Sequence, residues 1–208
     1  MSMQQPGRIA SLVLMSIAAA LFGWLAVARR SGATLEFDLG VRARVHEWAS
    51  PAMTTIARSV TVLGSPLVLS LLFAIAMLAF HRLEWRRPAI TVAEVMAGAI
   101  VCNIGLKELI RRARPEPFFG REPASYSFPS GHALYSLCFY GLIASVLAAH
   151  APERAARIGI WGAAALLIAG IGLSRVYLGV HYPSDVIAGY LGAAFVIGAV
   201  LAFSPGWS

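Results

Sequence analysis

Apolar stretches close to the length of a membrane span recur along the whole chain, and shorter polar segments separate them. Crossing the hydrocarbon core of a bilayer takes roughly 20 apolar residues in a helix. No segment shows the alternation of a strand, and backbone groups in lipid must be paired within their own element. We therefore predict an all-α, integral membrane bundle of six transmembrane helices, forming one domain over residues 1–208. The predicted spans are residues 9–28, 60–80, 89–106, 133–149, 158–173 and 186–203.

The segment between the first and second spans predicts an interfacial helix. Apolar residues recur there among charged ones, at three- and four-residue steps or their multiples, as in a helix that lies in the membrane surface. These residues are Leu39, Val45, Trp48, Ala52 and Ile56. Ser50 followed by Pro51 is typical of a helix start. The sequence Gly64-Ser65-Pro66 predicts a bend near the entry of the second span.

Composition supports a membrane protein. Hydrophobic residues make up 58% of the chain and charged residues 13%, against about 25% charged residues in soluble domains. The formal net charge is +7, but the basic residues lie between apolar spans, which favours lipid headgroups or an anionic substrate over nucleic acid. Cys102 and Cys138 lie inside apolar runs, so we expect neither a disulfide framework nor a cysteine-based metal site.

Three polar clusters, far apart in sequence, are predicted to meet at one membrane face. Lys107 and His132 flank a single polar loop, so both lie on the same side. From His132 the chain crosses the membrane, turns at residues 150–157 and crosses back. The segment from Ser174 to Asp185 therefore returns to that side.

The residue types in these clusters suit an anionic group such as phosphate. Lys107, the only lysine in the chain, lies with Arg114 and Arg175 among the cations expected there. Lysine acts as a compact charge, whereas arginine offers planar bidentate donors. Ser130 and Gly131 come just before the fourth span, where its helix is predicted to start, and the N-terminus of a helix is a natural anion site.

Two histidines and an aspartate could divide the work of phosphoryl transfer. One imidazole can attack phosphorus while the other protonates the leaving oxygen. Asp185 follows His181 by four residues, close enough to accept its Nδ1–H and fix the tautomer. Taken alone, a His-x3-Asp pair is often only a hydrogen bond or a pair of metal ligands, so the prediction depends on His132 and the other clusters.

These residues carry a family resemblance. The sequences Lys107-x6-Arg114-Pro115, Pro129-Ser130-Gly131-His132 and Ser174-Arg175-x5-His181-x3-Asp185 resemble, in order, the three signature motifs of the type 2 phosphatidic acid phosphatase (PAP2) superfamily. The resemblance implies a phosphatase that needs no metal or other cofactor and forms a phospho-histidine. It implies His181 as nucleophile, Asp185 as its partner and His132 as general acid. It also implies a phosphate-binding set of Lys107, Arg114, Ser130, Gly131 and Arg175.

The expected function is hydrolysis of the terminal phosphate of a membrane lipid, with phosphatidylglycerol phosphate, phosphatidic acid and undecaprenyl diphosphate as candidate substrates. A lipid phosphotransferase that uses the same site is the alternative within this chemistry. A six-helix anion transporter is the alternative from a different class. We expect no nucleic-acid partner and infer no obligate protein partner.

The remaining charged residues bear on the sidedness of the site. Arg111, Arg112 and Arg121 are interpreted as interface anchors. Glu94 lies within the third span, where an acid is either functional or paired internally. Six of the 17 basic residues lie on the N-terminal face, which read literally places the motif face in the cytoplasm, but discounting five possible site residues leaves the two faces equal. The resemblance favours a multi-pass protein of the cell (inner) membrane with an extracytoplasmic site.

Overall fold

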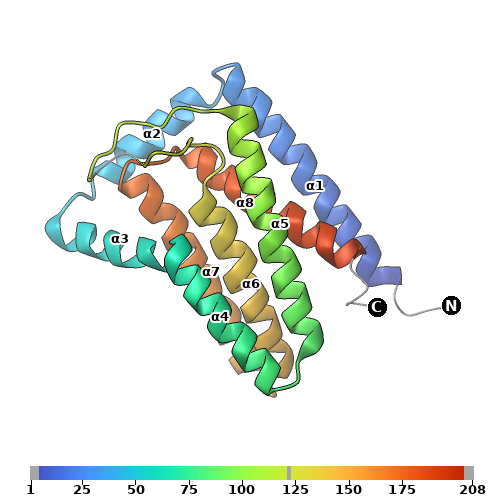
Figure 1. Cartoon of the computed structure of the whole chain (residues 1–208). Coiled ribbons are helices and arrows are strands. Elements are labelled where there is room, and N and C mark those ends of the chain that lie inside the picture. The colour runs from blue at the N-terminus through green and yellow to red at the C-terminus, as the bar shows by residue number, and fades with distance from the viewer. Residues whose placement is uncertain (1–4, 121–122, 204–208) are drawn as a thin grey trace.

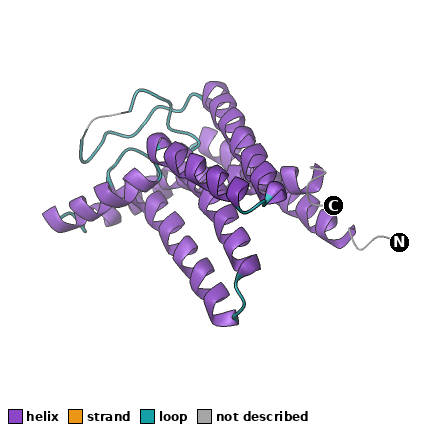
Figure 2. Ribbon diagram, turned by 60° about the horizontal axis from the view of Figure 1, so that its bottom comes forward, coloured by secondary structure: helices purple, strands orange, loops and turns teal. Residues whose placement is uncertain are grey.

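A computed structural model describes residues 5–120 and 123–203 of the chain. Within these residues the fold is all-helical, with eight helices and no strand (Figures 1 and 2), which confirms the predicted fold class. The helices are α1 (Gln5–Arg30), α2 (Leu35–His46), α3 (Pro51–Leu63), α4 (Pro66–Arg82), α5 (Arg86–Ile110), α6 (Gly131–His150), α7 (Arg154–Tyr177) and α8 (Pro183–Phe203).

Six membrane crossings can be drawn from these helices. Five of them, α1, α5, α6, α7 and α8, are each long and apolar enough to span a bilayer. The sixth crossing combines α3 and α4, which are bent by 48° at the break between them. The Ser65 side chain accepts a hydrogen bond from the Val68 amide, and Pro66 takes the first helical position, so a new helix begins there. The predicted second span is thus broken at the predicted Gly-Ser-Pro bend.

The predicted interfacial helix is two helices, α2 and α3, and α2 buries charge. Asp38 and Arg42 are buried on α2, whereas Leu35, Phe37 and Leu39 are about half exposed. The exposure of Leu39 agrees with the prediction of a helix whose apolar residues face the membrane surface. The polar face of α2 turns toward the protein because both charged side chains find partners there, and its apolar residues are left for the membrane surface.

Helix α6 lies in the middle of the bundle (Figure 1). Its buried residues Leu134, Cys138 and Leu142 share a core with residues from α5 and α8. At the start of α6 the approach of α8 depends on a glycine: a Cβ atom on Gly189 would lie 2.6 Å from the Ser130 carbonyl oxygen. This absence of a side chain lets the second turn of α8 lie against the first residues of α6.

One end of the bundle collects the ends of four helices. There α5 and α7 finish, α6 and α8 begin, and the α5–α6 loop passes over them beside α2 (Figures 1 and 2). Backbone hydrogen bonds join the layers: the Ser127 amide donates to the Arg112 carbonyl, and the Phe118 amide donates to the Leu178 carbonyl. The three polar clusters of the sequence therefore lie together at this end.

Candidate active site

His181 lies in the short turn between α7 and α8 and is only 2% exposed. Its Nδ1 atom lies 3.4 Å from Oδ2 of Asp185, and its Nε2 atom lies 3.0 Å from Nη1 of Arg114. A guanidinium can only donate, so Nε2 must be the accepting, unprotonated nitrogen. Nδ1 then carries the proton and faces Asp185. This tautomer directs the free lone pair of the imidazole toward the cationic side of the site.

The surroundings of His181 keep its ring neutral. Burial lowers the pKa of His181 from 6.5 to about 4, although the hydrogen bond and the charge of Asp185 act to raise it. The positive charges of Arg114 and Arg175 lower it further. A neutral imidazole retains its lone pair at pH 7, as a nucleophile requires.

Asp185 stands in the first turn of α8 with both carboxylate oxygens occupied. Its Oδ2 accepts the Tyr182 amide at 2.8 Å and also accepts the Ser127 hydroxyl. Its Oδ1 accepts Nη1 of Arg112 at 2.6 Å. The side chain is fully buried. This carboxylate is fixed from three directions, so it can hold the imidazole of His181 in one orientation.

Arg114 connects the α5–α6 loop to the α7–α8 turn. Its Nε donates to the Ser125 carbonyl at 2.6 Å, and its Nη1 donates to the Val180 carbonyl at 2.7 Å. Lys107, in the last turn of α5, donates to the Tyr126 carbonyl in the same loop. The two cations are therefore held beside His181 by backbone oxygens of the loop.

Ser130 precedes the first residue of α6, Gly131, and His132 follows in the first turn. Arg175, His181, Arg114 and Lys107 all lie near enough to His132 to act on its charge. A Cβ atom on Gly131 would lie 3.2 Å from Oδ1 of Asn103, so a larger residue would crowd the start of this helix.

Five buried donors have no hydrogen-bond partner among the described residues: Nε of Arg29, Arg42 and Arg175, and the hydroxyls of Ser130 and Ser136. Two of them, the Ser130 hydroxyl and Nε of Arg175, belong to the predicted phosphate-binding set. Arg175, in the last turn of α7, is otherwise held by Thr61, which accepts its Nη1 at 2.8 Å. An unsatisfied buried polar group costs roughly 1–3 kcal/mol. Both donors suit the oxygens of an anion, and all eight residues expected at the site are thus brought to one end of the bundle.

Arg112 corrects the interpretation from sequence. It was expected to be an interface anchor, yet its side chain is only 10% exposed and forms ion pairs with Asp185 at 2.6 Å and Asp38 at 2.8 Å. Arg111, in contrast, is 65% exposed and pairs with Glu108 in the last turn of α5, as an anchor would. Arg121 lies outside the described residues.

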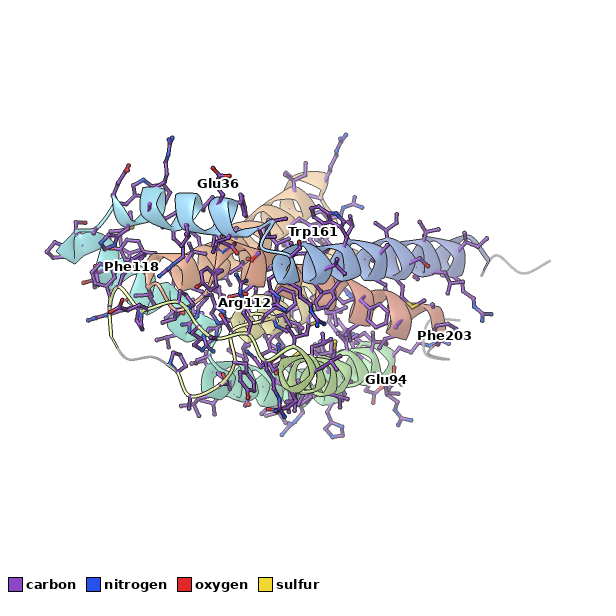
Figure 3. The ribbon with its side chains drawn as sticks, turned by 90° about the horizontal axis from the view of Figure 1, so that it is seen from above. Glu36, Glu94, Arg112, Phe118, Trp161 and Phe203 are labelled. Atoms are coloured by element: carbon purple, nitrogen blue, oxygen red, sulfur yellow. The ribbon has the colours of Figure 1, made fainter. Side chains whose placement is uncertain are left out.

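Asp38 and Ser127 were also missed as members of this site. Asp38 belongs to no motif, and nothing in the sequence distinguishes it from Glu36, the other acid in the first turn of α2. Ser127 lies three residues before the Ser130 motif position, and nothing in its spacing distinguishes it from Ser125. Glu94 lies near the opposite end of α5 and is exposed, away from Arg112 and the site (Figure 3).

No group of three or more His, Cys, Asp or Glu side chains in the described part of the chain could hold a metal ion. The donors that converge are instead cations and hydroxyls, with one buried histidine–aspartate pair. This arrangement suits the binding of an anion beside a neutral imidazole.

This chain is similar in sequence to a known protein family and to several phosphatases. The family model described as "PAP2 superfamily" matches residues 88–207. Phosphatidylglycerophosphatase B of Bacillus subtilis is 34% identical over 143 residues, covering 67% of this chain and 70% of that protein. Decaprenylphosphoryl-5-phosphoribose phosphatase of Mycobacterium tuberculosis is 36% identical over 163 residues, covering 73% and 80% of the two chains.

Among solved structures, the crystal structure of the transmembrane PAP2 type phosphatidylglycerolphosphate phosphatase from Bacillus subtilis matches with a TM-score of 0.78. It is 28% identical and covers 90% of this chain and 93% of that one. At this coverage the similarity extends into helices α1 to α4, which precede all of the residues that the family model matches.

Proposed function

The chain belongs to the PAP2 superfamily, and we propose that it hydrolyses the terminal phosphate of a membrane phospholipid or polyprenyl (di)phosphate through a phospho-histidine at His181. It is a multi-pass membrane lipid phosphatase of this family. The observation that carries the mechanism is the position of His181, whose Nδ1 faces Asp185 while its Nε2 faces the cation Arg114.

In the first half-reaction, Nε2 of His181 attacks phosphorus. The N–P bond forms as the bond from phosphorus to the lipid oxygen breaks, and His132 gives a proton to that departing oxygen. The proton on Nδ1 stays in place, and the carboxylate of Asp185 stabilises the positive charge that develops on the ring. Arg114 then donates to a phosphate oxygen instead of to Nε2.

In this proposal the groups around His181 bind the phosphate. Lys107, Arg114 and Arg175 offset the charge on the phosphoryl oxygens, and the Ser130 hydroxyl and the Gly131 amide donate at the start of α6. The unpaired Nε of Arg175 and hydroxyl of Ser130 support this assignment, because both donors are already in place and buried.

In the second half-reaction, His132 has lost its proton and acts as a base. It takes a proton from a water molecule, whose oxygen attacks the phospho-histidine. The new P–O bond forms as the N–P bond breaks, which releases inorganic phosphate and restores neutral His181. Neither half-reaction needs a metal ion, so we propose a metal-independent enzyme.

A lipid substrate is supported by an apolar groove beside the site. The groove has a volume of about 530 Å³, and its walls come from Leu69 and Phe73 on α4, Met96 and Ile100 on α5, and Tyr135 on α6. The Tyr135 hydroxyl donates to Asn103, whose side chain lies next to Gly131. A hydrocarbon tail lying in this groove would place its phosphate near the start of α6. The printed names of the relatives, a phosphatidylglycerophosphatase and a decaprenylphosphoryl-phosphoribose phosphatase, point to lipid phosphates as well.

Phosphate release by the detergent-purified protein tests this proposal. A panel of phospholipid and prenyl mono- and diphosphates identifies the substrate, and the His181→Ala variant serves as the inactive control. We expect release from at least one lipid, no release by the variant, and full activity in EDTA. Full activity of His181→Ala would refute the mechanism, and loss of activity in EDTA would indicate a metal-dependent one. A phosphorylated second product would indicate phosphotransfer, and binding without release would favour a transporter.

We also propose that the site faces the extracytoplasmic side of the cell (inner) membrane. Because α8 begins at the site and is long and apolar enough to cross the membrane, its last described residue, Phe203, is expected at the opposite membrane face. A fluorescent protein that matures only in the cytoplasm, fused to the C-terminus, is therefore expected to fluoresce. Alkaline phosphatase activity from the same fusion point would place the site in the cytoplasm.

A further inference from the structure

A buried carboxylate on the surface helix α2 holds the first turn of α8. Oδ1 of Asp38 accepts the Ser184 amide at 2.9 Å, and its Oδ2 accepts the Ser184 hydroxyl at 2.7 Å. Ser184 is the second residue of α8. Asp38 thus caps α8 from a different helix, and a negative charge is favourable at a helix N-terminus. The helix so held is the one that carries Asp185.

Arg112 joins this carboxylate to the one at His181. Its Nη2 lies 2.8 Å from Oδ2 of Asp38, and its Nη1 lies 2.6 Å from Oδ1 of Asp185 and 2.8 Å from the Ser184 hydroxyl. The guanidinium carbon lies 3.9 Å from the ring centroid of Tyr182. Figure 3 shows Arg112, which belongs to the α5–α6 loop, toward the middle of the molecule. The planar guanidinium of an arginine can donate to two carboxylates at once through its two terminal nitrogens, whereas a lysine ammonium lacks this geometry.

Helix α2 is bound to this end of the protein by a second arginine as well. Nη2 of Arg42 donates to the Glu116 carbonyl at 2.8 Å, and its guanidinium carbon lies 4.6 Å from the ring centroid of Phe118. Asp38 is therefore carried on a helix with fixed contacts to the α5–α6 loop. Its position relative to Asp185 does not depend on Arg112 alone.

Two carboxylates that share one guanidinium have an electrostatic consequence. If Arg112 paired with Asp185 alone, it would neutralise much of the charge that faces His181. Because Arg112 also pairs with Asp38, it neutralises less of the negative charge of Asp185. Asp185 therefore exerts a more negative potential on the imidazole. That potential stabilises the positive ring that forms when Nε2 bonds to phosphorus.

We propose that Asp38 and Arg112 are positioning residues of the reaction, which act through Asp185 to orient His181 and to set how strongly its developing charge is stabilised. The proposal rests on the proposed function of His181 as nucleophile. Neither residue touches the phosphate, and neither belongs to the three sequence motifs.

Removing Arg112 and removing Asp38 are expected to shift the pKa of His181 in opposite directions. Removing Arg112 removes a positive charge near His181 and raises its pKa; removing Asp38 removes a negative charge and lowers it. Other charged groups stay in place in both variants, so they do not change the direction of either shift. These groups are Arg29 on α1, Arg42 on α2, Lys107 on α5, Arg114 in the loop, His132 on α6, Arg175 on α7 and Asp185 on α8.

The test compares Arg112→Gln, Asp38→Asn and the double variant with two matched controls, Arg111→Gln and Glu36→Gln. Both control side chains are exposed, one beside Arg112 in sequence and one on the outer side of α2 (Figure 3). We expect kcat to fall roughly ten- to a hundredfold in each single variant, as for other residues that orient a reacting group, with KM within about twofold. The controls should match the wild type.

The pH profile separates positioning from damage to the fold. We expect the acid limb of kcat/KM to move up by on the order of one pH unit in Arg112→Gln and to stay at or below the wild-type position in Asp38→Asn. In the double variant the two lost charges cancel, so the limb should return to the wild-type position. Arg112→Lys keeps the charge but not the planar guanidinium, so it should lower kcat and leave the limb unmoved.

The proposal is overturned if both single variants keep the kcat of the controls. It is also overturned if the acid limb of kcat/KM moves in the same direction in the two single variants. A larger movement in the double variant than in Arg112→Gln would overturn it as well, because effects of general disruption add up whereas opposite charge changes cancel. The His181→Ala variant tests the proposed function separately from the positioning role of Asp38 and Arg112. An active His181→Ala enzyme refutes the proposed function, whereas an inactive one together with unaffected Asp38 and Arg112 variants refutes only this inference.

Discussion

Ser130 and Asp185 are joined through their backbones, because the Ser130 amide donates to the Asp185 carbonyl oxygen at 2.9 Å. This bond ties the start of α6, where the phosphate is proposed to bind, to the first turn of α8, which orients His181. The two helix N-termini therefore face one site and are held in register by the main chain. Side-chain chemistry at one can act on a group bound at the other without either helix having to move.

The close approach of α8 to α6 at Gly189 gives the first prediction. A Cβ atom there would lie 2.6 Å from the Ser130 carbonyl oxygen, which is backbone and cannot turn aside. Gly189→Ala should therefore destabilise the protein by about 1–3 kcal/mol, as overpacking does, and reduce kcat by displacing Asp185. Thermal unfolding in detergent and the rate of phosphate release measure the two effects.

Gly162 supplies the control for this substitution. It lies in the middle of α7, and a Cβ atom there would meet nothing within 4 Å. Gly162→Ala should leave activity unchanged and should stabilise the helix by roughly 0.5–1 kcal/mol. Equal behaviour of the two alanine variants would show that the contact at Gly189 does not position the site.

The neutral state of buried His181 predicts a pH-dependent stability. Its pKa is lowered from 6.5 to about 4 in the folded protein. Between these values the unfolded chain binds a proton that the folded protein does not, so stability falls as the pH drops from about 6.5 to about 4 and is unaffected above that range. The loss is on the order of 3 kcal/mol at the lower end.

The His181→Ala variant isolates this effect, because it lacks the titrating ring and keeps every other acid and base. Melting temperatures of both proteins are compared at pH 7.5 and pH 4.5 in the same detergent. The wild type should lose more stability than the variant on acidification. An equal loss in both would show that the imidazole is already solvated or protonated in the folded state.

The buried guanidinium of Arg175 predicts a loss of phosphate binding. Its Nε has no partner among the described residues, and its Nη1 is held by Thr61. Arg175→Gln should lower kcat/KM by roughly a hundredfold or more, as expected for a donor that meets charge developing in the transition state. Inhibition by vanadate should weaken in parallel. Arg111→Gln, which removes an exposed arginine, should change neither quantity, and equal effects of the two substitutions would contradict the assignment.

Much of this arrangement could be predicted from sequence, because the number of membrane spans between two segments determines whether they lie on the same face. Lys107 and His132 flank one loop, and two spans return the chain from His132 to Arg175, so no knowledge of packing is needed to place them at one face. The break at Gly64-Ser65-Pro66 is likewise local, since a serine cap followed by proline starts a new helix. The angle of 48° between α3 and α4 is set by packing and has no such signature.

The Asp38–Arg112 network could not be predicted in this way. Arg111 and Arg112 are adjacent and chemically identical, and which one turns inward depends on where α5 ends. Arg111 adopts a left-handed conformation with φ of 47°, which terminates the helix and turns Arg112 toward α8. Asp38 meets Ser184 across 146 residues of sequence. Neither the helix end nor the long-range contact leaves a periodic pattern.

Covalent capture of the phosphoryl group decides whether His181 is the nucleophile. The wild-type enzyme is mixed with a lipid substrate labelled with ³²P in its terminal phosphate, quenched in alkali within the first turnover, and digested for mass spectrometry. We expect an acid-labile, alkali-stable phosphoryl group on the peptide that contains His181, and none in His181→Ala. Phosphate released without any labelled protein in that first turnover, or label on a different residue, would contradict it.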